Sequence, residues 1–216
     1  MAAENPSEYS IIGKPTPKKD AWLKVTGQAE YADDLFLPGM LYGKLLRSPH
    51  PHARIVHVDT SRAAALPGVR AVITGRDFPG IKYGNVPQTR DYLPLAIDRV
   101  RYIGDEVAAI AASDEDTAEE ALDLIQVEYE LLPAVFDADE AMQPGAPQIH
   151  DHAPGNISGQ SAFHFGDVER GFAAADYIQE DLFETQPIKH GMLEPHACVG
   201  TWDKTGKITL RACKQS

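Results

Sequence analysis

Cysteine is scarce in this sequence of 216 residues, where only Cys198 and Cys213 occur. Neither belongs to a Cys-x-x-Cys pair, and two thiols cannot supply the four-thiolate set of an iron–sulfur cluster. The count also excludes a small scaffold held together by disulfides, since such folds need several cysteines. Low cysteine content is typical of a reducing compartment, so we expect a cytoplasmic protein.

Long apolar runs are missing as well. No segment approaches the roughly 20 consecutive apolar residues that span a bilayer. Residues 1–20 contain no apolar stretch of the length found in a signal peptide. The sequence therefore predicts no membrane partner and supports the expected cytoplasmic location.

Basic residues are fewer than acidic ones. Lysine and arginine together number 20 against 32 aspartates and glutamates, which gives a formal net charge of -12. Such a surface repels phosphate backbones, so we expect no nucleic acid partner. With 43% hydrophobic and 24% charged residues, the composition is that of an ordinary globular protein. The length allows one large or two small domains, each with a hydrophobic core.

Several signatures of nucleotide binding and catalysis are absent, among them Gly-x-Gly-x-x-Gly, the P-loop, Gly-x-Ser-x-Gly and His-Glu-x-x-His. Carboxylates do cluster at Asp33 and Asp34 and in residues 114–116. Catalytic carboxylates work as pairs whose environments separate their pKa values. We instead interpret the first cluster as a turn and the second as negative charge at the start of a helix. We therefore expect no catalytic residue in this chain.

Histidine pairs raise the question of a metal. His50 and His52 form one His-x-His pair, with His57 nearby, and His150 and His152 form another around Asp151. Zinc needs three or four ligands that converge. Both pairs lie in proline-rich turns, and a flexible segment rich in proline and glycine does not preorganise such a set. We interpret these side chains as turn histidines and expect no metal site.

Periodicity predicts a mixture of helices and strands. Ala118, Ala121, Leu122 and Ile125 fall at i, i+3, i+4 and i+7, which predicts an amphipathic helix over residues 114–125. Alternating or continuous apolar patterns predict strands at residues 40–48, 55–59, 69–75, 106–113, 126–136 and 176–186. Residues 196–202 and 207–213 predict a hairpin closed by a turn over residues 203–206. The fold class that this mixture indicates is α+β.

Composition also predicts the domain organisation. Residues 1–20 are polar and rich in proline and lysine, as in an extended arm, and a compact domain follows over residues 21–142. Residues 143–160 are rich in proline, glycine and histidine, so we interpret them as an exposed linker. Residues 161–216 then contain a short predicted helix at 166–176 and the hairpin.

Four segments carry a family resemblance. They are LKVTGQAEYADD at residues 23–34, GKLLRSPHPHARI at 43–55, VRYIGDEVAAIAA at 100–112 and HGMLEPHACVGTW at 190–202. Together they resemble the N-terminal part of the large, molybdopterin-binding subunit of the xanthine dehydrogenase family, the molybdenum hydroxylases. Among members, the pattern is nearest to the alpha subunit of 4-hydroxybenzoyl-CoA reductase, with xanthine dehydrogenase-like bacterial enzymes close behind.

The resemblance implies a fold. It identifies residues 21–142 as an α/β hammerhead domain, and residues 161–216 as the first strands of a molybdopterin-binding domain. In the complete enzyme, molybdopterin with molybdenum would act on an aromatic or heteroaromatic substrate. An iron–sulfur small subunit and an FAD-containing medium subunit would be the partners.

The resemblance also bears on individual residues. Gln215 matches a family glutamine whose side chain approaches the molybdenum and the pterin, although Lys214 stands where the family has threonine. Glu194 matches a hydrophobic-Glu-Pro segment, and we interpret it as a paired carboxylate that braces a turn. The glycine-rich cofactor loop of the family and its catalytic glutamate have no counterpart in these residues.

Three hypotheses remain open at this point. The chain is the N-terminal portion of a molybdenum hydroxylase large subunit, inactive alone and binding no cofactor by itself. Alternatively, it is a non-enzymatic assembly or binding domain derived from such a subunit, or one half of a split subunit that a second polypeptide completes. Whether this chain is itself an enzyme is therefore undecided by its sequence.

Overall fold

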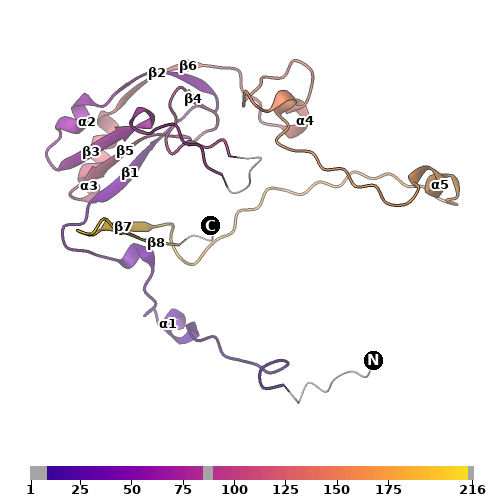
Figure 1. Cartoon of the computed structure of the whole chain (residues 1–216), viewed down its shortest axis with the longest axis horizontal. Helices are drawn as coiled ribbons and strands as arrows, with labels where there is room; N and C mark the ends of the chain where they lie inside the picture. Colours follow the sequence, from indigo (N-terminus) through magenta and orange to yellow (C-terminus); the bar gives the residue numbers. More distant parts are fainter. Residues whose placement is uncertain (1–8, 85–89, 214–216) are drawn as a thin grey trace. The chain divides into compact units, whose positions relative to one another are not determined.

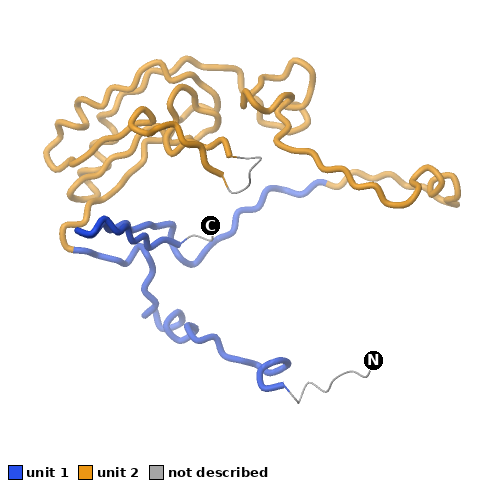
Figure 2. The backbone as a smooth tube through the Cα atoms, in the orientation of Figure 1, with its two compact units in different colours: residues 1–37, 184–216 blue, residues 38–183 orange. Residues whose placement is uncertain are grey.

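The computed structural model describes residues 9–84 and 90–213. Contacts divide the chain into two compact units, which are coloured in Figure 2. One unit comprises Pro38–Phe183, and the other combines Met1–Leu37 with Glu184–Ser216. Helices and strands are mixed along the chain, which confirms the expected α+β class. The domain boundaries that we expect from composition stay predictions.

Two three-stranded antiparallel sheets form the larger unit (Figure 1). The first has the order β1-β5-β3 and the second the order β4-β2-β6. Their strands are β1 (Tyr42–Arg47), β2 (Ala53–Asp59), β3 (Val69–Thr74), β4 (Arg99–Val100), β5 (Glu106–Ala112) and β6 (Gln126–Leu131). The central strands are β5 in the first sheet and β2 in the second, and each is paired on both edges. In both sheets the paired strands are far apart in sequence.

Helix α3 (Glu115–Leu124) confirms the helix predicted from periodicity. It packs against β1, β3 and β5 and against helix α2 (Ser61–Ala65), with Ala118 and Ala121 fully buried. The Asp114 side chain caps its first turn by accepting a hydrogen bond of 2.8 Å from the Thr117 N–H. Acidic residues then follow in the first turn, where the helix dipole stabilises negative charge.

The core consists mainly of small side chains, which let α3 and the strands approach closely. Two clusters of buried residues form it, and Val58 on β2 and Val127 on β6 pack against both. The clusters are Ala63, Ala108, Ile110, Ala112, Ala118, Ala121 and Ile125, and Ala53, Ile55, Ala96, Val100 and Val107. The two sheets therefore share one continuous apolar interior.

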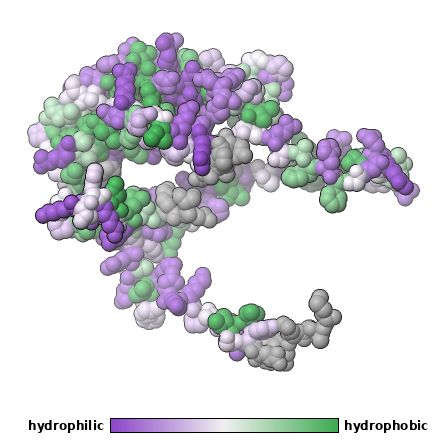
Figure 3. All heavy atoms as spheres, viewed as in Figure 1, coloured by the Kyte–Doolittle hydropathy of each residue, from purple (hydrophilic) through white to green (hydrophobic). Residues whose placement is uncertain are grey.

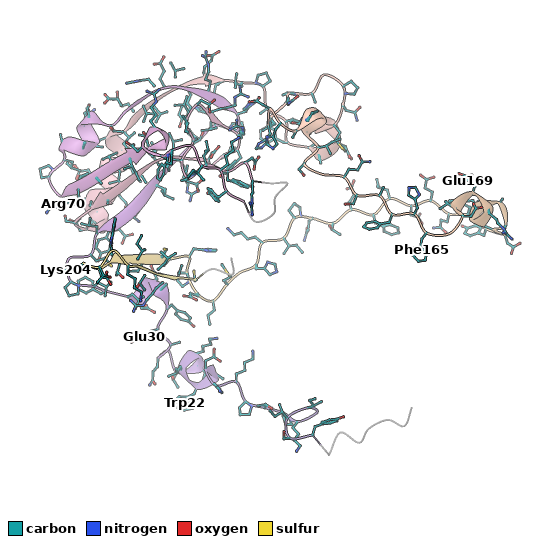
Figure 4. All side chains as sticks on the ribbon, in the orientation of Figure 1. Trp22, Glu30, Arg70, Phe165, Glu169 and Lys204 are labelled. Carbon is teal, nitrogen blue, oxygen red and sulfur yellow. The ribbon has the colours of Figure 1, made fainter. Side chains whose placement is uncertain are left out.

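The rest of the larger unit is irregular. It contains α4 (Ala138–Ala141), the 3-10 turns η3 (Gly75–Asp77) and η5 (Pro154–Asn156), and α5 (Val168–Ala173), which lies within the helix predicted at residues 166–176. Figure 4 shows Phe165 on the extended segment before α5, where it is 98% exposed. The strand predicted at residues 176–186 is wrong, since those residues form no strand. An alternating pattern makes a strand only where a neighbour pairs with its backbone.

The smaller unit contains a helix, a 3-10 turn and a hairpin. Helix α1 (Ala21–Val25) and the turn η2 (Ala32–Asp34) precede the larger unit in sequence, and β7 (Cys198–Trp202) and β8 (Ile208–Ala212) follow it. The two strands are antiparallel, and the Asp203 carboxylate accepts from the Thr205 N–H at 2.8 Å and the Lys207 N–H at 3.1 Å. The predicted hairpin is confirmed.

In the part of the chain that the structure describes, no helix has both the length and the apolar character needed to cross a membrane.

Candidate functional site

The glutamine expected near a cofactor, Gln215, lies outside the described residues. Glu194, in the same resembling region, is described: its Oε1 accepts a hydrogen bond of 3.1 Å from the Ala32 N–H of turn η2. The Glu194 carboxylate therefore braces the turn η2, which is remote in sequence, whereas the sequence predicted that it braces the turn before its own strand.

The first histidine pair does not converge on a common point. His52 is buried, and its Nδ1 donates to the Pro133 carbonyl oxygen at 2.6 Å. His50 instead meets the Tyr129 ring edge-on, with the ring centroids 5.0 Å apart. His57 is exposed on β2, opposite Glu128. In the described structure, His52 serves local hydrogen bonding and His50 serves packing.

A cavity of about 550 Å³ lies in the larger unit. Its walls come from two stretches of chain, within residues 91–105 and 135–158. Apolar side chains such as Phe136 and Ile149 alternate there with charged ones. Concave sites of this size with a few convergent polar groups are where proteins usually bind small ligands. This cavity is therefore the candidate functional site of the described residues.

Arginine and aspartate shape the electrostatics of the cavity wall. Arg99 pairs with Asp151 at 3.3 Å, and Arg101 donates from Nε to the Ile149 carbonyl at 3.2 Å. The Asp105 carboxylate accepts from the Arg101 N–H at 2.9 Å. Burial raises the pKa of Asp105 above its usual range, and the Arg101 N–H opposes that shift.

The second histidine pair lines the same cavity and meets a carboxylate from the other wall. His150 Nδ1 lies 2.7 Å from Asp91 Oδ2, and His152 Nε2 lies 3.8 Å from the same oxygen. The two imidazole rings meet edge-on at 5.7 Å between centroids. Burial lowers the pKa of His150, and the Asp91 charge opposes that effect. Sequence reasoning missed Asp91, because nothing in the residues around it indicates proximity to a segment almost 60 positions away.

The described residues offer no cradle for the pterin cofactor that the resemblance implies. Among residues 161–213, no described side chain is buried. A groove of about 710 Å³ in the smaller unit is lined by three acidic and two basic side chains, namely Asp20, Glu30, Glu194, Lys24 and Arg211. Pterin phosphates bind where N–H donors and cations prevail. This groove therefore lacks the excess of donors and cations that a phosphate group needs.

Two known families match most of the chain. Residues 26–133 match the aldehyde oxidase and xanthine dehydrogenase a/b hammerhead domain, and residues 149–216 match the molybdopterin cofactor-binding domain. These two matches confirm the fold that the resemblance implies.

Individual relatives agree with these matches. A probable xanthine dehydrogenase component of Bacillus subtilis is 44% identical over 95% of this chain, which covers 27% of that protein. The nicotinate dehydrogenase large molybdopterin subunit of Eubacterium barkeri is 37% identical over 97% of the chain, which covers 48% of it. The chain thus spans between about a quarter and a half of the length of these relatives.

Solved structures are similar too. Quinoline 2-oxidoreductase from Pseudomonas putida 86 superposes with a TM-score of 0.82 and 31% identity, over 94% of this chain and 27% of that one. Cu,Mo-CO dehydrogenase superposes with a TM-score of 0.75 and 33% identity, over 92% of this chain and 27% of that one.

Proposed function

Because the chain belongs to the aldehyde oxidase and xanthine dehydrogenase family, we propose that it serves as the N-terminal portion of a molybdenum hydroxylase large subunit. The observation that carries the proposal is the order of the two matched domains, hammerhead first and molybdopterin-binding second, in a single chain. In the complete enzyme, molybdopterin with molybdenum would supply the oxidoreductase chemistry. This chain would supply scaffold and contact surface.

The structural support for a scaffolding role is the contrast between a closed core and an open hairpin. The two sheets of the larger unit bury their own apolar side chains. On the hairpin, Trp202 of β7 and Ile208 and Leu210 of β8 stay largely exposed. A two-stranded hairpin is marginally stable in water unless further chain covers it. We propose that other parts of the molybdopterin-binding domain cover this apolar surface.

We further propose that residues 1–216 alone bind no molybdopterin and oxidise no substrate. The basis is the missing glycine-rich loop and catalytic glutamate, together with the exposed state of residues 161–213. Elemental analysis of the purified chain tests this directly. Stoichiometric molybdenum would overturn it.

For the substrate class we propose an aromatic or heteroaromatic ring. Several relatives are named after nicotinate, nicotine, xanthine or quinoline, all of which contain a nitrogen heteroaromatic ring. A 4-hydroxybenzoyl-CoA reductase-like activity stays a prediction from the sequence resemblance. For partners we propose an iron–sulfur small subunit and an FAD medium subunit, in line with relatives named as large subunits or large chains. A cytoplasmic location also stays a prediction.

The experiment is reconstitution of a large subunit from two chains. Residues 1–216 are coexpressed with the part of the Bacillus subtilis relative that this chain does not match, and the pair is purified through a tag on one partner. We expect a one-to-one complex that contains molybdenum. Trp202→Asp with Leu210→Asp should abolish the complex, whereas Arg70→Glu, an exposed site on β3, should leave it intact.

The same experiment addresses the non-enzymatic alternative. A full chain that forms no complex, remains a monomer by size exclusion with light scattering, and unfolds in one transition including the hairpin would contradict the large-subunit proposal. A self-standing assembly or binding domain would then be the better account.

A further inference from the structure

Three potential metal ligands converge at the wall of the cavity. The ligand atoms of Asp91, His150 and His152 all lie within 4.8 Å of one another. Ligands of one tetrahedral zinc ion, each about 2.0–2.1 Å from the metal, lie about 3.3 Å apart. The separations of 2.7 and 3.8 Å between Asp91 Oδ2 and the two imidazole nitrogens bracket that value. Both separations from Asp91 therefore lie near ligand spacing, and the two imidazole nitrogens lie within 4.8 Å of each other.

The loop that carries the histidines is held in place by hydrogen bonds. Asn156 has a positive φ of 59° and reaches back across the loop. Its side-chain amide donates to the Ala141 and Pro147 carbonyls at 2.9 and 3.0 Å, and its side-chain oxygen accepts from the Ile149 N–H at 2.9 Å. Gln148 adds bonds to two more loop carbonyls, at 3.1 and 3.0 Å. The premise that a flexible linker cannot gather ligands does not hold for this segment.

Of the two acidic side chains near the cluster, only Asp91 faces the histidines. Asp151, between them in sequence, turns away to pair with Arg99. Asp91 is the least exposed of the three candidate ligands, with 15% of its side chain accessible. Neutral imidazole and carboxylate are the ligand types that zinc and neighbouring divalent metals prefer. The set thus has the right chemistry as well as the right spacing.

We propose that Asp91, His150 and His152 bind one divalent transition-metal ion of the zinc type, with water from the cavity as a further ligand. The ion would tie the segment around Asp91 to the loop over residues 148–156. The proposal does not involve the family cofactor, and its test does not depend on the proposed function.

The test is a titration of the full 216-residue chain with zinc(II) and cobalt(II). It is done in a Cys198→Ser/Cys213→Ser background, because cysteine thiolates bind the same ions. Calorimetry measures the stoichiometry, and the visible absorption of cobalt reports four-coordinate geometry. We expect one ion per chain and a saturable rise in melting temperature, since a ligand that binds only the folded state stabilises it.

Three variants assign the ligands. Asp91→Asn keeps the shape of the side chain but removes its charge, and should weaken binding by at least about tenfold. His150→Ala/His152→Ala should abolish saturable binding. The matched control, His164→Ala/His190→Ala, removes two exposed histidines outside the cluster and should leave the affinity unchanged.

Circular dichroism without metal checks that each variant folds. If the double histidine variant does not fold, the result for Asp91→Asn decides the proposal. The proposal is overturned if the parent chain shows no saturable binding, in which case His150 and Asp91 form an ordinary ion pair. It is equally overturned if Asp91→Asn binds as the parent does, or if the control variant loses binding.

Discussion

Strands β5 and β8 are both short and antiparallel, yet four residues of β5 are buried and none of β8. Strand β5 has a partner on each edge, β1 and β3, and helix α3 on one face. Strand β8 pairs only with β7. An apolar sequence alone therefore does not make a core, since the burial of a strand depends on the number of strands and helices that pack against it.

The same contrast extends along the chain. Buried residues run from Ala32 to Ala153, and none of the described residues after Ala153 is buried. Figure 3 shows hydrophobic side chains at the surface along the segment that carries α5. We expect residues 38–153 to unfold cooperatively, and residues 154–213 to contribute little to that transition. The substitutions below place matched changes in the two regions.

The largest expected difference comes from truncating an isoleucine in each region. Ile110 on β5 is 2% exposed, and Ile208 on β8 is 65% exposed. Ile110→Ala should lower the free energy of unfolding by about 2–5 kcal/mol, because it leaves a cavity in the core. Ile208→Ala should change it by less than about 0.5 kcal/mol. Urea denaturation of both variants measures the two values, and equal losses would erase the contrast between the regions.

Glycine substitutions should show a smaller contrast. A Cβ at Gly75 would lie 2.5 Å from the Ala96 carbonyl oxygen, which is backbone and cannot rotate away. Gly75→Ala should therefore cost about 1–3 kcal/mol through overpacking. Gly171 in α5 has open space around the corresponding position. Gly171→Ala should leave the denaturation midpoint unchanged, and a loss like that of Gly75→Ala would show that α5 belongs to the cooperative core.

Helix caps provide the third comparison. Asp114 caps α3, and Asp167 caps α5 by accepting from the Arg170 N–H at 3.0 Å. Asp114→Ala should lower the melting temperature by a few degrees, whereas Asp167→Ala should not change it. Calorimetric melting compares the two variants, and a matching drop for Asp167→Ala would contradict the proposed division.

The Asp114 effect should also depend on pH. Hydrogen bonds from the Thr117 N–H hold the pKa of this carboxyl below its usual value. The stabilisation is therefore present above the ordinary carboxyl pKa and is lost as pH falls through the lowered folded value. Melting curves at neutral and strongly acidic pH should show the difference between parent and Asp114→Ala shrinking in acid.

The smallest expected effect is a gain in stability from replacing Asp105. Because burial raises the pKa of Asp105, its ionised form destabilises the fold at neutral pH. The destabilisation grows as pH rises from the ordinary carboxyl pKa to the folded value, and it is absent in stronger acid. Asp105→Asn should raise the melting temperature by about a degree or two at pH 7 and by nothing near pH 3. A loss of stability at pH 7 would mean that the hydrogen bond from the Arg101 N–H needs the charged carboxylate.

The sequence predicted those helices and turns that are determined by residues close together along the chain. The spacing of Ala118, Ala121 and Ile125 predicted helix α3, and the turn at Asp203 and Gly206 predicted the β7–β8 hairpin. Cap, turn and periodicity are properties of short segments, so they can be read without knowing the fold.

Pairing between distant segments could not be predicted in this way. The alternation at residues 176–186 indicated a strand, but a strand forms only with a partner, and the described chain provides none there. Asp91 meets His150 only because the topology folds two remote stretches around one cavity. Likewise, the side chain of Asn156 anchors a loop whose proline and glycine content predicted an exposed linker.

Hydrogen exchange of the full chain, followed by mass spectrometry, compares the buried core around β5 with the exposed hairpin residue by residue. We expect strong protection of the β5 amides, and exchange near the unstructured rate for residues 154–213. We also expect β7 and β8 to become protected once the remaining part of a large subunit is bound. Protection of β8 equal to that of β5 in the isolated chain would show that the hairpin needs no further chain to cover it.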